Sequence, residues 1–344
     1  MKQIPLIIDT DPGIDDAVAI ALAVFNPRFD VRLITTVAGN VSIEATTTNA
    51  LKLMAYYGKD VPVARGAAEP LIRQLDDASD IHGKTGMEGF DFPEPKTELL
   101  LDKHAVEAMR DEIMASAEPV TVMPIGPLTN IALLLKTFPE VKSRIERIVL
   151  MGGSVTRGNK GVMAEFNIFV DPEAAKIVLT SGLDITMATL DAGLGTVIPP
   201  EKTAQLKDMG KVGLMAHDLF QRYRKRSFGT GLKMYDACAV ACLLEPDLFD
   251  MTKAFVDVEI AGELTAGCTV VDLKGYLKRE PNATVTTGVH ADRFCDWFMD
   301  GIAHCAWSLV SSTPLTPAPL SASIFVNSTT ENKRTKKGPD RWNW

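Results

Sequence analysis

The sequence is short of the features that mark several classes of protein. It has only five cysteines in 344 residues and no CxxC pair, so neither a disulfide-stapled secreted domain nor a zinc module is expected. No window approaches the ~18 uncharged apolar residues that a membrane span needs. The start of the chain does not resemble a signal peptide, and together with reduced thiols this predicts a cytoplasmic protein with no membrane partner.

Positive charge is also scarce, and it is unevenly placed. The net charge is −8, which offers no basic footprint for nucleic acid. Residues 331–344 hold five cations and two anions, a net charge of +3, so the remaining chain carries −11. We expect one catalytic domain over residues 1–310. A polar, basic extension over residues 311–344 should follow it, and composition leaves open whether that extension is ordered.

Apolar residues are plentiful, at 46% of the chain, and they alternate between two patterns. Continuous apolar runs are typical of strands buried on both faces, and helical segments separate them. This order predicts an α/β fold, a single large domain with a mostly parallel central sheet flanked by helices. Strands are predicted at residues 5–8, 31–37, 61–63, 120–125, 147–151 and 185–190, and helices at 15–24, 43–57, 104–116, 129–137 and 172–181.

Four carboxylates follow the first predicted strand within eight residues: Asp9, Asp11, Asp15 and Asp16. Their repulsion would be costly without a cation, and helix capping would account for only two of them. Ligands bind at the carboxyl ends of parallel strands, where this cluster lies. Oxygen ligands select Ca²⁺ or Mg²⁺ over zinc, and carboxylates combined with a carbonyl and waters favour Ca²⁺.

Two kinds of hydrolase chemistry fit this cluster. One is phosphoryl transfer to an aspartate with Mg²⁺, and the other is attack by a metal-activated water with a carboxylate base. The first requires a phosphate-clamping lysine and a later acidic pair, neither of which is evident. It also expects threonine or valine at the position of Gly13. The second chemistry is therefore preferred.

The segment IIDTDPGIDDA at residues 7–17 resembles the signature of the inosine-uridine-preferring nucleoside hydrolases. The resemblance extends over about residues 4–307 and is nearest to bacterial ribonucleoside hydrolases acting on both purine and pyrimidine nucleosides. It implies a Rossmann-like fold and hydrolysis of the N-glycosidic bond through an oxocarbenium-like transition state. Further blocks match in chain order: TVAGNV at 36–41, HGKTGM at 82–87, PIGPLTN at 124–130, VLMGG at 149–153, AEFN at 164–167, DPEAA at 171–175 and YDACAV at 235–240.

The resemblance also assigns roles to individual residues. Ca²⁺ would be held by the carboxylates of Asp11, Asp16 and Asp236 and by the backbone carbonyl of Ile125. Asp11 would act as general base toward the metal-bound water. The ribose hydroxyls would be held by Asp15, Asn40, Glu165 and Asn167, the 5′-hydroxyl by Asn159, and Met151 would pack under the sugar unless it is plain core. His82, Phe166 and Tyr223 would face the base, with His82 on a mobile lid over residues 76–92.

One position departs from the family pattern. Tyr235 stands where purine-processing members carry a histidine that protonates the leaving base. A tyrosine, with an ordinary pKa near ~10, is a poorer proton donor at neutral pH. Either His82 or a water chain supplies the proton, or the purine rate is reduced, or Tyr235 only stacks on the base. The alternative function is a catalytically weakened nucleoside-binding protein. Family members are usually dimers or tetramers, so a homo-oligomer is expected.

Overall fold

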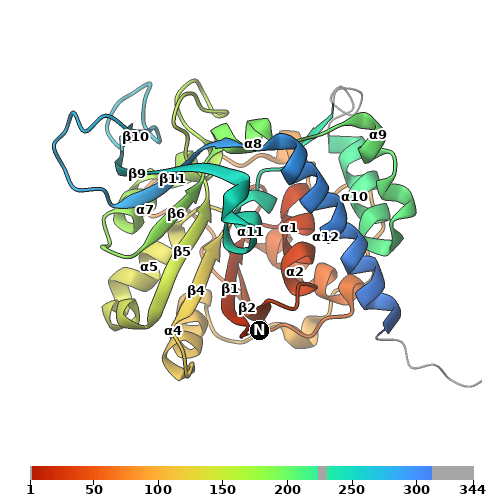
Figure 1. Ribbon diagram of the computed structural model, residues 1–344. Coiled ribbons are helices and arrows are strands. Elements are labelled where there is room, and N and C mark those ends of the chain that lie inside the picture. The colour runs from red at the N-terminus through yellow and green to blue at the C-terminus, as the bar shows by residue number, and fades with distance from the viewer. Residues whose placement is uncertain (1, 224–230, 312–344) are drawn as a thin grey trace, which may run out of the picture. The chain divides into compact units, whose positions relative to one another are not determined.

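Nine strands form one mixed sheet in the computed structural model, which describes residues 2–223 and 231–311 (Figure 1). The strand order is β10-β9-β11-β6-β5-β4-β1-β2-β3, and all neighbours from β11 to β3 run parallel. Strands β9 and β10 add an antiparallel edge. The strands are β1 Ile4–Thr10, β2 Phe29–Thr36, β3 Val63–Arg65, β4 Val120–Pro124, β5 Ile145–Met151, β6 Ile185–Ala188, β9 Phe249–Val258, β10 Thr269–Asp272 and β11 Ala283–Val289, and β7 Val197–Ile198 pairs separately with β8 Leu232–Lys233.

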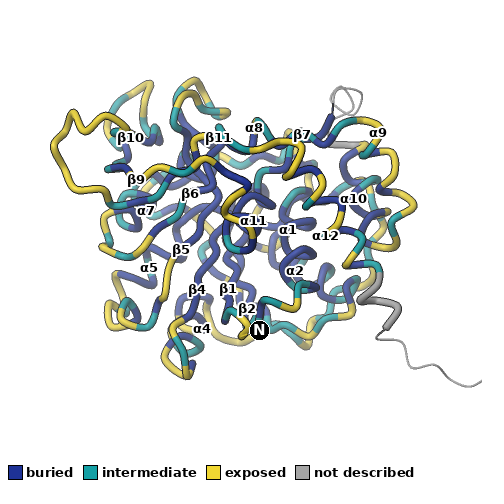
Figure 2. Tube along the Cα trace, viewed as in Figure 1, coloured by how far each residue is buried: buried dark blue, intermediate teal, exposed yellow. Residues whose placement is uncertain are grey.

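Helices cover both faces of the sheet (Figure 1), and a separate apolar core lies between the sheet and the helices on each face. The central strands are buried, whereas the loops around β10 are exposed (Figure 2). One face carries α1 Ile14–Val24, α2 Ile43–Tyr57, α10 Gly210–Tyr223, α11 Ala237–Leu244 and α12 Ala291–Ser311; the other carries α4 Ala105–Ala115, α5 Thr129–Thr137 and α7 Pro172–Leu179. The short helices are α3 Ser79–His82, α6 Phe166–Val170, α8 Leu190–Gly195 and α9 Pro200–Thr203.

The local sequence explains where these helices begin and end. Ser42 caps α2 by accepting a hydrogen bond from the Ala45 N–H, and Gly58 ends this helix at φ +62°. Asp171 caps α7 through the Ala174 N–H, with Pro172 at the first helical position. Each of these N-caps satisfies one backbone N–H that the first turn of a helix leaves unpaired. The sequence-based prediction of Asp171 as a cap is therefore confirmed.

The strand order places one loop at a topological switch point. Strand β1 lies between β2 and β4. From β1 the chain adds β2 and β3 on one side of the sheet, and then adds β4, β5 and β6 on the other side. A crevice at the carboxyl ends of such strands is where ligands bind in open α/β sheets. The acid loop is located there; we use this name for residues 9–16, from the end of β1 to the first turn of α1. Ile125, directly after β4, lies at the same edge of the sheet.

The predicted α/β fold with a mostly parallel sheet is confirmed, with local corrections. The strand predicted at 61–63 lies instead at Val63–Arg65, after Pro62, which has no N–H to donate. The strand predicted at 185–190 ends at Ala188, because Thr189 caps α8. The extension over residues 311–344 lies outside the described residues from 312 onward. Among the described helices, none has both the length and the apolar character required to cross a bilayer.

Candidate active site

Two glycines allow the Asp11 carboxylate to sit at the switch point. A Cβ at Gly126, after β4, would lie 2.6 Å from Asp11 Oδ1, and a Cβ at Gly39, after β2, would overlap Oδ2. The side chain is therefore enclosed by backbone from three strands and is 1% exposed. The Asn40 N–H donates to Asp11 Oδ2 at 2.7 Å, whereas Oδ1 accepts no hydrogen bond from any described residue. A buried acceptor of this kind requires a donor or a cation.

A cluster of three carboxylates lies beside Asp11. Oxygen atoms of Asp15, Asp16 and Asp236 all lie within 4.8 Å of one another. Asp16 is held by Thr10 Oγ1 at 2.6 Å and by the Gly13 N–H at 2.9 Å. Asp236 comes from the start of α11, 220 positions along the chain. Geometry thus adds Asp15, which the resemblance assigned to ribose, to the group that can surround a cation.

Burial and the charges of neighbouring carboxylates make Asp11, Asp16 and Asp236 reluctant to ionise. Burial and the Asp16 charge raise the pKa of Asp11 well above its usual range. Burial and Asp15 raise the pKa of Asp16 to about 7. Burial, Asp15 and Asp16 raise the pKa of Asp236 strongly. A divalent cation would offset the repulsion and satisfy Asp11 Oδ1, so the residues fit a hard cation with oxygen ligands.

A second polar group comes from the end of β5 and the start of α6. Glu165 caps α6 and accepts hydrogen bonds from the N–H groups of Gly153 at 2.9 Å and Asn167 at 3.0 Å. Asn167 Nδ2 donates to the carbonyls of Ile125 and Met151, both at 3.1 Å. The predicted ribose-binding residues Glu165 and Asn167 therefore lie next to the Ile125 carbonyl that was predicted to bind metal. Met151 is 5% exposed and packs in the core.

The other predicted residues differ in how closely they join this group. Asn159 is exposed, and its Oδ1 accepts a hydrogen bond from the Phe166 N–H at 2.9 Å. Tyr235 is half-buried, with its ring against Gly193 of α8. Helix α10 ends at Tyr223, whose side chain lies outside the part that the structure describes.

His82 is not a surface histidine, although it lies in a segment whose sequence is polar. Its side chain is buried, at 6% exposure. A Cβ at Gly13 of the acid loop would lie 2.6 Å from His82 Nδ1, so the imidazole rests on this loop. Residues 82 and 13 are brought together by the folding of α3 over the carboxyl end of β1.

The structure leaves Asp9 out of the carboxylate cluster, although the sequence grouped it with the other three acids of residues 9–16, and it gives Asn49 partners that the sequence did not predict. Asp9 is fully buried and accepts hydrogen bonds from Thr35 Oγ1 at 2.5 Å and Asn130 Nδ2 at 2.8 Å. Burial raises the pKa of Asp9 to about 7. Asn49 of α2 contacts the acid loop through the Pro12 carbonyl. The sequence feature that could have identified Asp9 and Asn49 is a polar side chain at an inward-facing position, of a strand for Asp9 and of a helix for Asn49.

The buried Glu165 predicts a specific pH dependence of stability. Burial raises the pKa of Glu165 to about 7, so the protonated form is favoured in the folded protein. Its contribution to stability is full below the unfolded pKa near 4.5 and is lost as pH rises through about 7. Glu165→Gln removes this titration. In thermal unfolding with chelator, we expect the melting temperature of the variant, relative to wild type, to be lowest at pH 5 and to recover by pH 8.

Glu173→Gln is the matched control for this measurement. Arg73 lowers the pKa of Glu173 in the folded protein, so this group is mostly ionised from pH 5 to pH 8 in both folded and unfolded states. Its offset from wild type should stay constant over that range. A constant offset for Glu165→Gln as well would contradict the assignment of a raised pKa to Glu165.

Fold and site together define an α/β protein with a buried carboxylate cluster that could hold a cation at the switch point of a parallel sheet. The model of the family "Inosine-uridine preferring nucleoside hydrolase" matches residues 6–296. A non-specific ribonucleoside hydrolase RihC of Salmonella paratyphi C is 50% identical over 299 residues, which is 87% of this chain and 97% of that protein. The chain therefore belongs to the inosine-uridine preferring nucleoside hydrolase family.

Solved structures agree with this assignment. A purine-preferring ribonucleoside hydrolase from Gardnerella vaginalis matches with a TM-score of 0.81 and 32% identity, covering 88% of this chain and 99% of that one. An inosine-guanosine nucleoside hydrolase matches with a TM-score of 0.80 and 28% identity, covering 89% and 99%. The relatives thus include proteins named for broad and for purine-preferring activity.

Proposed function

We propose that this protein hydrolyses the N-glycosidic bond of ribonucleosides and releases ribose and a free purine or pyrimidine base. The observation that carries the proposal is the group of Asp15, Asp16 and Asp236 oxygens within 4.8 Å of one another, beside the unsatisfied Oδ1 of Asp11. The 50% identity to a ribonucleoside hydrolase named non-specific supports a broad range of bases.

Ca²⁺ is the cation that suits these residues. Asp11, Asp16, Asp236 and the Ile125 carbonyl would hold it, and Asp15 lies close enough to contribute. When bound, Ca²⁺ supplies positive charge that lowers the pKa of water and orients ribose hydroxyls. Asn167 Nδ2 donates to the Ile125 carbonyl, and that oxygen has a second lone pair with which it could bind the cation.

Asp11 would act as the general base, and its fixed place beside the carboxylate cluster supports this role. Its carboxylate accepts the proton of the attacking water while the oxygen of that water bonds to the anomeric carbon of ribose. The bond from that carbon to the base nitrogen breaks, and its electron pair leaves with the base. The Asn40 N–H at Oδ2 and the enclosing glycines fix the orientation of Asp11, so little reorganisation precedes proton transfer.

The leaving base would lie between His82 and Tyr235. His82 rests on the acid loop at Gly13, and Tyr235 directly precedes the cluster residue Asp236. The hydroxyl of Tyr235 is a hydrogen-bond donor at neutral pH, which would stabilise negative charge on the base as it leaves. Phe166 and Tyr223 would complete the apolar surroundings of the base.

An assay of ribose release tests the proposed function. Inosine, uridine, cytidine, adenosine and xanthosine are each incubated with the protein, with and without EDTA, and reducing sugar is measured. We expect release that EDTA abolishes and added Ca²⁺ restores. No ribose from any of the five would reject the function. Binding of a nucleoside without release would instead identify the weakened binding protein considered above.

Tyr235→Phe tests the role of the tyrosine hydroxyl. The variant keeps the ring against Gly193 and removes only the hydrogen-bond donor. We therefore expect kcat/KM for inosine to fall about tenfold, because this factor corresponds to the free energy of one hydrogen bond to a charged group. Steady-state rates with inosine and uridine provide the measurement. Unchanged rates on both substrates would show that Tyr235 only stacks on the base.

Two further expectations stay predictions of this proposal. A homodimer or homotetramer is expected, for which light scattering of the purified protein is the measurement. A cytoplasmic location and nucleoside salvage are the cellular setting that such an activity would suit.

A further inference from the structure

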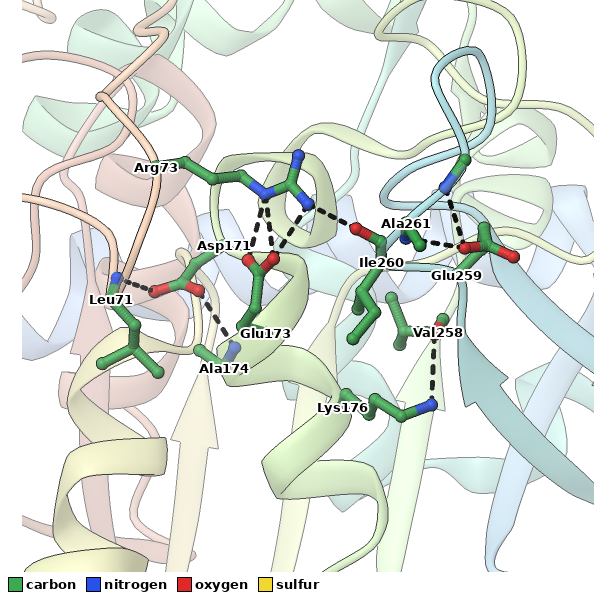
Figure 3. Close-up of polar contacts among 11 residues, drawn as sticks. Leu71, Arg73, Asp171, Glu173, Ala174, Lys176, Val258, Glu259, Ile260 and Ala261 are labelled. Carbon is green, nitrogen blue, oxygen red and sulfur yellow. Dashed lines mark hydrogen bonds and ion pairs between the residues drawn. The ribbon is translucent and has the colours of Figure 1, made fainter.

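The lid segment, residues 76–92, is anchored on its N-terminal side by a polar network (Figure 3). Asp171 at the start of α7 accepts a hydrogen bond from the Leu71 N–H at 2.8 Å. Arg73 makes paired contacts of 2.8–3.2 Å with Glu173 and donates to the Ile260 carbonyl at 2.7 Å. The chain entering the lid segment is therefore bound to α7 and to the connection between β9 and β10.

An aromatic cluster anchors the other side of the lid segment. The ring of Tyr56 on α2 lies 5.2 Å from that of Phe90 and 5.7 Å from that of Phe92, in edge-to-face orientations. Phe90 and Phe92 lie 5.0 Å apart. Such pairs stabilise beyond the burial of their area. Both ends of the segment are thus fixed, and the part between them spans the acid loop.

A side-chain amide joins the middle of the lid segment to the acid loop by hydrogen bonds. Asn49 of α2 is 3% exposed, and its Nδ2 donates to the Pro12 carbonyl at 2.8 Å and to the Thr85 carbonyl at 2.7 Å. Pro12 belongs to the acid loop and Thr85 to the lid segment. We call these two hydrogen bonds the Asn49 bridge. Each of the two amide hydrogens serves one of the two segments.

Close packing at Gly86 reinforces the Asn49 bridge. Gly86 has φ +82°, which favours glycine, and a Cβ there would lie 3.0 Å from Asn49 Nδ2 and 3.3 Å from the Pro12 carbonyl oxygen. The Ala78 N–H also donates to the Asn40 carbonyl at 3.1 Å. The lid segment therefore fits against the acid loop with almost no space between the two backbones.

We propose that Asn49 is a positioning residue that holds the lid segment, and with it His82, against the acid loop. If Thr85 moves away, Asn49 loses one hydrogen bond but keeps the one to Pro12, so the side chain stays in place to receive the segment again. Its effect on substrate affinity rests on the proposed function, because His82 would face the base. The structural effect does not depend on it.

Hydrogen exchange of the free protein tests the bridge without any substrate. In Asn49→Ala, we expect amide exchange in the peptide covering residues 77–89 to accelerate about three- to tenfold, the loss of one buried hydrogen bond. Gly86→Ala should accelerate the same peptide, because its methyl group disturbs the contact from the lid side and leaves the Asn49–Pro12 hydrogen bond intact. Unchanged exchange of this peptide in Asn49→Ala would overturn the proposal.

Asn282→Ala is the matched control. Asn282 Nδ2 also donates to two backbone carbonyls, those of Leu179 at 2.9 Å and Val256 at 2.8 Å, but it contacts neither the lid segment nor the acid loop. It should lower the melting temperature without changing exchange in residues 77–89. Equal acceleration in this variant would overturn the proposal, because general destabilisation would then explain the result.

Kinetics separate positioning from a purely structural role. With the substrate that releases most ribose, Asn49→Ala should raise KM about three- to tenfold and leave kcat within about twofold. A lower kcat with unchanged KM would overturn the proposal in favour of a disturbed Asp11. A protein that releases no ribose rejects the proposed function, and the exchange experiment then still decides the role of Asn49.

Discussion

Replacement of Asp236 by asparagine is expected to lower kcat for ribonucleosides by roughly 10³-fold and, at the same time, to stabilise the metal-free protein. The loss of activity follows because one carboxylate ligand of the proposed cation is removed, and a preorganised charge at the reacting centre is worth several kcal/mol. The gain in stability follows because Asp236 is buried beside Asp15 and Asp16, and the negative charges of these carboxylates repel one another.

Thermal unfolding measures the second effect directly. In EDTA, the melting temperature of Asp236→Asn should exceed that of wild type by a few degrees, since ~1 kcal/mol shifts the midpoint by roughly 2–4 °C. In excess Ca²⁺ the order should reverse, because wild type gains binding energy that the variant has lost. This opposite response to metal separates a ligand from a carboxylate that merely fills space.

Asp247→Asn is a suitable control for this pair of measurements. Asp247 follows the same helix but is exposed and lies outside the cluster. It should match wild type in EDTA, in Ca²⁺ and in activity. If Asp236→Asn melts below wild type in EDTA and is stabilised by Ca²⁺ to the same extent, Asp236 is not a ligand.

Removal of the 2′-hydroxyl from the substrate is expected to lower kcat/KM by roughly 10⁴-fold. Polar groups built to pair a hydroxyl remain buried and unpaired when it is missing, which is the strongest form of substrate discrimination. Glu165 and Asn167 are buried and held by backbone hydrogen bonds, so they cannot turn away to find other partners. Asp15 is part of the carboxylate cluster and cannot turn away freely either.

Rates for inosine and 2′-deoxyinosine measured side by side test this prediction. Asp15→Ala serves as the reference variant: it should lose more activity on inosine than on 2′-deoxyinosine, so the ratio between the two substrates shrinks, because any effect of Asp15 on the cation lowers both rates. Comparable kcat/KM values for both substrates with wild type would exclude a role of these residues in recognition of the ribose hydroxyls.

Much of the site could be predicted because it depends on local sequence. The acid loop, with Asp11, Asp15 and Asp16, joins a strand to a helix, and both elements are specified by apolar periodicity and, for the helix, by the two acids in its first turn. The sequence also places these carboxylates at the carboxyl end of a parallel strand, which is where α/β sheets bind ligands. The class of cation follows from the oxygen ligands alone.

Tertiary structure decided the contacts that join distant segments. Asp236 reaches the acid loop from α11, Asn167 reaches the Ile125 carbonyl, and His82 is buried on Gly13 although its local sequence is that of a surface loop. A single-sequence pattern encodes which face of an element is apolar, but not which side chains of other elements meet there.

Asn49 illustrates, at a single residue, the difference between what the sequence predicts and what the tertiary structure decides. Its position on α2 shows only that a polar side chain points inward, and nothing local predicts its partners. The positive φ at Gly86 and the strand order that brings α2 beside the acid loop create the space between Pro12 and Thr85 that one amide fills. The sequence by itself determined the chemistry of the carboxylates. Only the fold determined what holds a lid over them, because hydrogen-bond partners far apart in the chain are set by packing.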